Sequence, residues 1–119
     1  MGKRSRRRDK VSAPTTDYTS PGGDVLTLRG SLSPATRREY AALMAGGTAP
    51  AQTREDIWQR GVEFLFERLA VAWTVAGVET TRQKELLARF RVASAQERAW
   101  IRDVLREHVA EWFPDVQAP

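Results

Sequence analysis

The sequence predicts an all-α fold: a compact four-helix domain, residues 24–119, behind a disordered Arg-rich arm, residues 1–23, with one short extended segment. Three observations favour this fold. Helix-capping signals recur along the chain, the apolar residues that follow them have helical spacing, and a single stretch alternates as a strand does. With 119 residues and 41% apolar content, the chain has room for one folded domain.

Each helix is predicted from a capping residue at its start and a glycine or proline after its end. The predicted helices run from Ser33 to Gly46, from Thr53 to Ala76, from Thr80 through Phe90, and from Ser94 to the residue before Pro114. Glu97 stands three residues after Ser94, which is the spacing of a capping box. The second helix is the longest, and its apolar residues cover more than half of its circumference, so we expect it to be central and to face either its neighbours or a partner protein.

The extended segment is Asp24 to Arg29, in which Leu26 and Leu28 alternate with polar residues. No second strand is predicted downstream of it. The segment is therefore expected to lie as a strap across the helices, with pairing to a sheet edge of another chain as the alternative.

Basic residues are concentrated in the first ten positions, where six of them stand against Asp9 alone. They are Lys3, Arg4, Arg6, Arg7, Arg8 and Lys10. The formal net charge of the whole chain is +4, so the rest of it is close to neutral. This distribution predicts a disordered arm that contacts nucleic acid without sequence preference, with a solubilising tail or an anionic membrane surface as alternatives.

Cysteine is absent, which excludes disulfides, a thiolate nucleophile and a Cys-ligated zinc site, and makes a cytoplasmic location the default expectation. Val11 to Pro14 do not form the apolar core of a secretory signal, and residues 62–78 are too short and too charged to span a membrane. Glu107 is adjacent to His108 and not three residues before it, so the helical di-metal pattern is missing. No enzyme activity and no cofactor are predicted.

Charged side chains on the last helix form rows in which successive residues are one helical turn apart. Arg98, Arg102 and Arg106 follow one flank of its apolar stripe. Like charges at this spacing repel weakly, so the row is expected to meet Glu63 and Glu67, solvent, phosphates or a partner protein. Arg68 falls within the apolar arc of the second helix, where it is expected to form an ion pair or to anchor an interface. These four arginines are the predicted partner-binding residues.

His108 lies near the middle of the apolar stripe of the last helix. A single imidazole at such a position is more often a hydrogen-bonded core residue than a catalyst. We therefore expect His108 to be structural.

Residues 83–106 resemble a helix-turn-helix pair in which Ser94 caps the recognition helix, although the usual turn glycine is missing. In that interpretation Gln96 and Arg98 would contact bases, and phosphates would be contacted by Arg89, Arg91 and Arg102. The function that the sequence favours is different: a non-enzymatic accessory or assembly subunit that binds protein partners or itself while the arm contacts nucleic acid. A DNA-binding regulator is the alternative.

Overall fold

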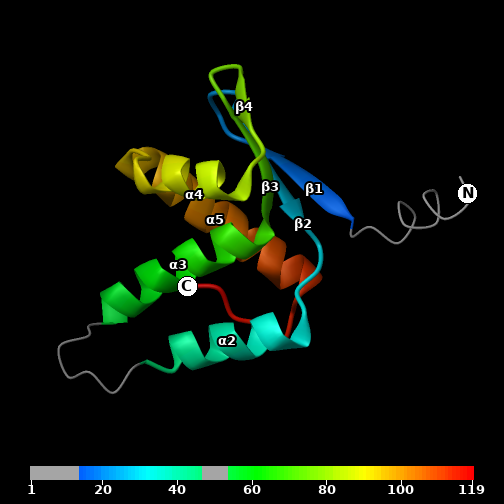
Figure 1. Cartoon of the computed structure of the whole chain (residues 1–119), viewed down its shortest axis with the longest axis vertical. Coiled ribbons are helices and arrows are strands. Elements are labelled where there is room, and N and C mark those ends of the chain that lie inside the picture. The colour runs from blue at the N-terminus through cyan, green and yellow to red at the C-terminus, as the bar shows by residue number, and fades with distance from the viewer. Residues whose placement is uncertain (1–13, 47–53) are drawn as a thin grey trace, which may run out of the picture.

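The computed structural model describes residues 14–46 and 54–119, and these residues form an α+β fold, not the predicted all-α fold. Four strands make one antiparallel sheet in the order β1-β2-β3-β4. The described helices are α2 (Pro34–Met44), α3 (Arg54–Leu69), α4 (Gln83–Arg91) and α5 (Ala95–Trp112), and the strands are β1 (Thr15–Thr19), β2 (Val25–Arg29), β3 (Ala70–Val75) and β4 (Val78–Thr80). Figure 1 shows the helices gathered beside the sheet, with α2 running along α3.

The extended segment around Leu26 is an inner strand of the sheet, so the strap interpretation is wrong. Strand β2 pairs with β1 on one side and with β3 on the other, within the same chain. Residues 15–19, which the sequence analysis assigned to the arm, form β1. The turn after β1 is closed by the Asp24 amide, which donates to Ser20 Oγ at 3.0 Å. Strand β1 was not predicted because its sequence, Thr-Thr-Asp-Tyr-Thr, is polar. It is an edge strand, and Tyr18 is the one large apolar residue on its inner side.

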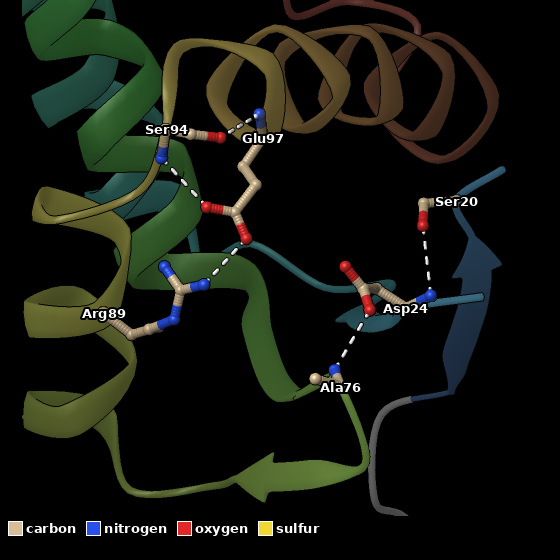
Figure 2. A network of polar contacts seen from close by, with 6 residues as sticks. All are labelled: Ser20, Asp24, Ala76, Arg89, Ser94 and Glu97. Atoms are coloured by element: carbon tan, nitrogen blue, oxygen red, sulfur yellow. Dashed lines mark hydrogen bonds and ion pairs between the residues drawn. The ribbon is translucent and has the colours of Figure 1, made fainter. Parts of the chain in front are cut away.

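The second predicted helix is too long at its C-terminal end. Helix α3 stops at Leu69, and the chain passes directly into β3. The residues that widened the apolar arc, such as Val71 and Trp73, are β-branched or aromatic and belong to a strand. Ala76 and Gly77 then form a two-residue hairpin turn, with φ of 50° and 80°. The Ala76 amide donates to Asp24 Oδ1 at 3.2 Å, which links the two turns at this end of the sheet (Figure 2).

The local helix starts agree with the sequence in two cases. Ser33 caps α2 by accepting a hydrogen bond from the Thr36 amide at 3.1 Å. Ser94 and Glu97 form the reciprocal capping box of α5, which ends at Trp112, before Pro114. The prediction that Thr80 opens a helix is wrong, because this residue ends β4 and α4 begins at Gln83.

The core lies between one face of the sheet and helices α3, α4 and α5. Leu26 and Trp73 are register partners on neighbouring strands and are both buried. Trp73 meets Phe66 of α3 edge to face, with the ring centroids 5.7 Å apart. Phe66 in turn stacks on Phe90 of α4, with the ring centroids 4.8 Å apart. This line of rings joins the sheet to both helices and holds α3 in place beside the α4–α5 corner.

The segment after α5 folds back along α2. Arg37 forms an ion pair with Asp115, with Nη1 and Oδ2 2.9 Å apart. The Tyr40 hydroxyl donates to the Gln117 carbonyl oxygen at 2.5 Å, and burial raises the pKa of Tyr40 to about 12. Arg106 Nε donates to the backbone oxygen of Pro119 at 2.6 Å. These contacts close the side of the core that faces α2.

Candidate protein-docking groove

A groove of about 650 Å³ lies between the first half of α3 and the corner where α4 meets α5. Its floor combines the aromatic rings of Trp58 and Phe90 with small apolar side chains. Charged side chains from α3 and α5 form its walls. The lining residues are Glu55, Asp56, Trp58, Gln59, Arg60, Val62, Glu63, Phe90, Ala93, Ala95, Arg98, Ala99 and Arg102. We call this feature the α3–α5 groove.

Trp58 is placed in the groove by the helical period of α3. It stands one turn before Val62, and Leu65, Phe66 and Leu69 continue the same buried face toward the sheet. Trp58 lies at the end of this face that is furthest from the sheet. Its relative exposure is therefore 37%, whereas Val62 is only 8% exposed.

Arg98 and Arg102 approach the aromatic floor from α5, one turn apart. The Arg102 guanidinium carbon lies 5.8 Å from the centroid of the Trp58 ring. Its Nε is buried and has no hydrogen-bond partner within the described residues. The Arg98 guanidinium carbon lies 5.5 Å from the Phe90 centroid, and Nη2 donates to the Arg91 carbonyl oxygen at 2.6 Å. Both cations thus lie against rings, an arrangement that is stabilising, and both residues line the groove.

The two walls of the groove carry opposite charge. The α3 wall has three carboxylates, Glu55, Asp56 and Glu63, and one guanidinium, that of Arg60, whereas the α5 wall has two guanidiniums and no carboxylate. Across all lining residues the acids and bases balance at three each. A polyanion such as nucleic acid would meet as much repulsion as attraction here, so this charge pattern suits a ligand that itself carries both signs.

A polar network holds the corner between α4 and α5, as Figure 2 shows. The Ser94 amide donates to Glu97 Oε1 at 2.9 Å, and Arg89 Nη2 donates to Glu97 Oε2 at 2.7 Å. The backbone hydrogen bond from Ser94, together with Arg89, lowers the pKa of Glu97. The same Arg89 guanidinium carbon lies 4.9 Å from the Trp73 centroid. The corner is thereby attached both to the helix start and to the core, which makes the α5 wall a rigid surface.

Glu63, a lining residue of the groove, is paired with Arg91 of α4. Arg91 Nη2 donates to Glu63 Oε1 at 2.9 Å, and this hydrogen bond to the carboxylate raises the pKa of Arg91. The row of arginines on α5 was expected to meet Glu63 and Glu67. The Glu63 ion pair is instead made by an arginine of α4.

The structure brings together only two of the four arginines that the sequence marked for partner binding. Arg98 and Arg102 line the groove. Arg68 instead forms an ion pair with Glu39 at 3.4 Å, and Arg106 holds Pro119 as described above. Arg68 also lines a second, smaller hollow of about 350 Å³ beside β3. The six basic residues of the predicted arm lie outside the described residues.

The residues proposed for a DNA-reading head make internal contacts. Arg89 and Arg91 form ion pairs with Glu97 and Glu63. Gln96 is exposed at the start of α5. Two of the three phosphate-contacting candidates are therefore already neutralised within the domain, so a reading head would have to exchange these pairs for phosphates.

Neither Trp58 nor the acidic wall was predicted to be part of a defined site. Trp58 was placed on the apolar arc of the second helix, and the acidic residues were placed in its first turn or on its polar strip. The available signal was a tryptophan that follows Glu55 by three residues and Asp56 by two, at the start of an apolar stripe. That signal does not reveal which other helix completes the groove.

His108 is fully buried and hydrogen-bonded at both ring nitrogens, as expected for a core histidine. The Arg29 carbonyl oxygen can only accept, so the imidazole Nε2–H donates to it at 2.8 Å. Nδ1 must then accept the Tyr18 O–H, also at 2.8 Å. Burial lowers the pKa of His108, while the Arg29 carbonyl and Glu111 oppose this effect. Burial, with smaller contributions from Glu107 and Glu111, raises the pKa of Tyr18 to about 12. Both groups are thus neutral at physiological pH.

Residues 14–46 and 54–119 contain no cluster of three or more His, Cys, Asp or Glu side chains that is arranged to hold a metal ion. No helix in this part of the chain is both long and apolar enough to cross a membrane. Comparison of the chain with models of known protein families, with curated proteins and with solved structures finds no match.

Proposed function

We propose that this protein is a non-enzymatic accessory or assembly subunit that binds a protein through the α3–α5 groove, while its basic N-terminal residues contact nucleic acid. The α3–α5 groove replaces the broader surface of helices that the sequence suggested. The single observation that carries the proposal is the partly exposed Trp58, which lies beside Arg102 in the apolar floor of the groove.

The composition of the groove supports a protein ligand. Tryptophan and arginine are the residues most enriched among those that dominate binding energy at protein interfaces. Val92, which is 76% exposed, directly precedes the lining residue Ala93. Two of the three large hydrophobic residues that are exposed in the described part of the chain, Trp58 and Val92, therefore lie at or beside the groove. Exposed apolar side chains that cluster next to charged walls are typical of an interaction surface.

Site-specific photocrosslinking in living cells tests this function. A photoreactive phenylalanine analogue replaces Gln59, an exposed residue that lines the groove. The matched control carries the analogue at Val78, which is 68% exposed on the β4 hairpin. The proposal expects one discrete protein adduct at Gln59 and none of that mass at Val78.

A second substitution makes this result specific. Trp58→Ala added to the Gln59 probe should reduce the adduct strongly, because truncating a central aromatic anchor costs about 2 kcal/mol, or roughly 30-fold in affinity. Equal yields of adduct at Gln59 and Val78, or a yield at Gln59 that Trp58→Ala does not change, would show that the groove is not the binding surface.

The nucleic-acid part of the proposal rests on the charge of residues 1–10. Replacing Arg4, Arg6, Arg7 and Arg8 by Gln in the full chain should abolish binding to duplex DNA and RNA. If all six cations contact phosphates, the affinity of the unchanged protein should fall roughly 1,000-fold between about 50 mM and 200 mM salt. Sequence-specific binding that survives the substitutions would favour the DNA-binding regulator instead.

A further inference from the structure

We propose that the protein seated on the α3–α5 groove is a second copy of this chain, related to the first by a two-fold axis. In this dimer the acidic α3 wall of each protomer faces the basic α5 wall of its partner. This inference rests on the proposed function, because it names the partner of the same groove.

The charge pattern of the groove makes it complementary to itself. Its net lining charge is zero: all three acids lie on the α3 wall with Arg60, which leaves that wall acidic, and the α5 wall carries Arg98 and Arg102. A two-fold axis brings each surface patch against an identical patch in the opposite direction. Glu55 on α3 is then set near Arg98 and Arg102 of the partner subunit, and the reverse contact occurs at the same time. An all-acidic or all-basic groove would repel its own copy.

The apolar residues fit the same arrangement. Trp58 projects from α3 toward α5, where the Arg102 guanidinium carbon lies 5.8 Å from its ring centroid, and it remains 37% exposed. The two-fold axis pairs each α3 wall with the α5 wall of the partner subunit. A residue between these walls lies near the axis, so Trp58 packs against Trp58 of the partner subunit. Offset aromatic pairs of this kind contribute about 0.5–1.5 kcal/mol beyond the area that they bury.

The guanidiniums of Arg98 and Arg102, which line the groove, also gain from a second copy. A carboxylate brought alongside the α5 wall accepts a charge-assisted hydrogen bond from the guanidinium edge. The Glu63–Arg91 pair is exposed, with side-chain exposures of 37% and 59%, so exchanging its partners costs little.

Charge reversal of one wall at a time tests the arrangement. One variant, Glu55→Lys with Gln59→Lys, makes both walls basic, and the other, Arg98→Glu with Arg102→Glu, makes both walls acidic. Sedimentation equilibrium of the full chain, from about 1 µM to about 500 µM, should show a reversible dimer with micromolar Kd for the unchanged protein. Each variant alone should bind itself at least 10-fold more weakly, whereas an equimolar mixture should form a 1:1 dimer.

Glu79→Lys on β4 is the matched control, since Glu79 is exposed and does not line the groove. It should leave the dimer constant unchanged. Cooperative thermal unfolding of every variant establishes that the loss of association does not come from loss of the fold.

Three results overturn the inference. An unchanged protein that stays monomeric across the range has no self-association, and a groove adduct with a different protein would then leave the proposed function standing. If the charge-reversal variants dimerise as strongly as the unchanged protein, or if only Glu79→Lys weakens the dimer, the dimer interface lies on another surface. If both charge-reversal variants are folded but do not associate when mixed, the pairing of each α3 wall with the α5 wall of the partner subunit is refuted.

Discussion

The sole histidine makes the stability of this protein depend on pH in a way that can be traced to one residue. His108 is 0% exposed, and burial favours its neutral form, in which Nδ1 accepts from the Tyr18 O–H and Nε2 donates to the Arg29 carbonyl oxygen. Acidification adds a proton at Nδ1, the atom that now accepts from Tyr18, and places a charge in the core. The unfolded chain takes up this proton near the ordinary pKa of 6.5, before the folded protein does.

The sign and size of the effect follow from this difference. The folded pKa is lowered, so the unfolded state binds more protons below pH 6.5 and stability falls as the pH falls. If the folded imidazole stays neutral throughout, the free energy of unfolding at pH 5.5 is about 1.4 kcal/mol smaller than at pH 8. Glu111 of α5 and the Arg29 carbonyl favour the charged ring and reduce the loss.

Urea unfolding monitored by circular dichroism between pH 8 and pH 5.5 measures the change. His108→Gln should remove most of the slope between pH 7 and pH 5.5, because no other histidine remains. In the unchanged protein, NMR titration of the single imidazole should give a pKa below 6.5, which tests the cause without any substitution. A flat stability profile together with an imidazole pKa of 6.5 or above would refute the reasoning.

Three further substitutions test local features of the fold. Ser94→Ala removes the side-chain acceptor of the Glu97 amide and should lower the free energy of unfolding by about 1 kcal/mol in urea titrations. Gly77→Ala places a side chain at a φ of 80° in the β3–β4 turn, which should cost about 1 kcal/mol and lower the melting temperature by several degrees. Gly30→Ala would set its Cβ 2.8 Å from the Trp112 ring, so a loss of about 1–3 kcal/mol and a shift in tryptophan emission are expected; unchanged emission would contradict this packing.

The correct predictions concern interactions that close within a few residues. Ser33 and Ser94 cap their helices by binding amides three positions away, so a short stretch of sequence contains both partners. The structural role of His108 could be predicted as well, because an isolated imidazole on an apolar stripe lacks the neighbours that catalysis requires.

The incorrect predictions concern β structure, whose partners are distant in sequence. Leu26 pairs with Trp73, which is 47 positions further along the chain. Val71 to Val75 follow a helix without any glycine or proline, so their apolar pattern extended the helix in the sequence. A strand is stabilised by neighbours and not by its own hydrogen bonds, so β2 could not be recognised as an inner strand while β1 and β3 were unassigned.

The candidate site was likewise predictable where it depends on local spacing and not predictable where it depends on distant contacts. The sequence alone identified Arg98 and Arg102 as one row on a helix, because a spacing of four residues places them on one flank. It could not say that Arg68 and Arg106 would be engaged elsewhere, by Glu39 and Pro119.

Sequence determined the helix caps at Ser33 and Ser94, the excess of cations in the first ten residues and the row of arginines along the last helix. Tertiary structure alone decided that α3 ends at Leu69, and that its first half faces the α4–α5 corner to form the groove around Trp58. The physical reason is the range of the interactions. Capping and helical spacing depend on neighbours within one or two turns, whereas strand pairing and the meeting of two helix faces are set by packing between segments that are far apart in the chain.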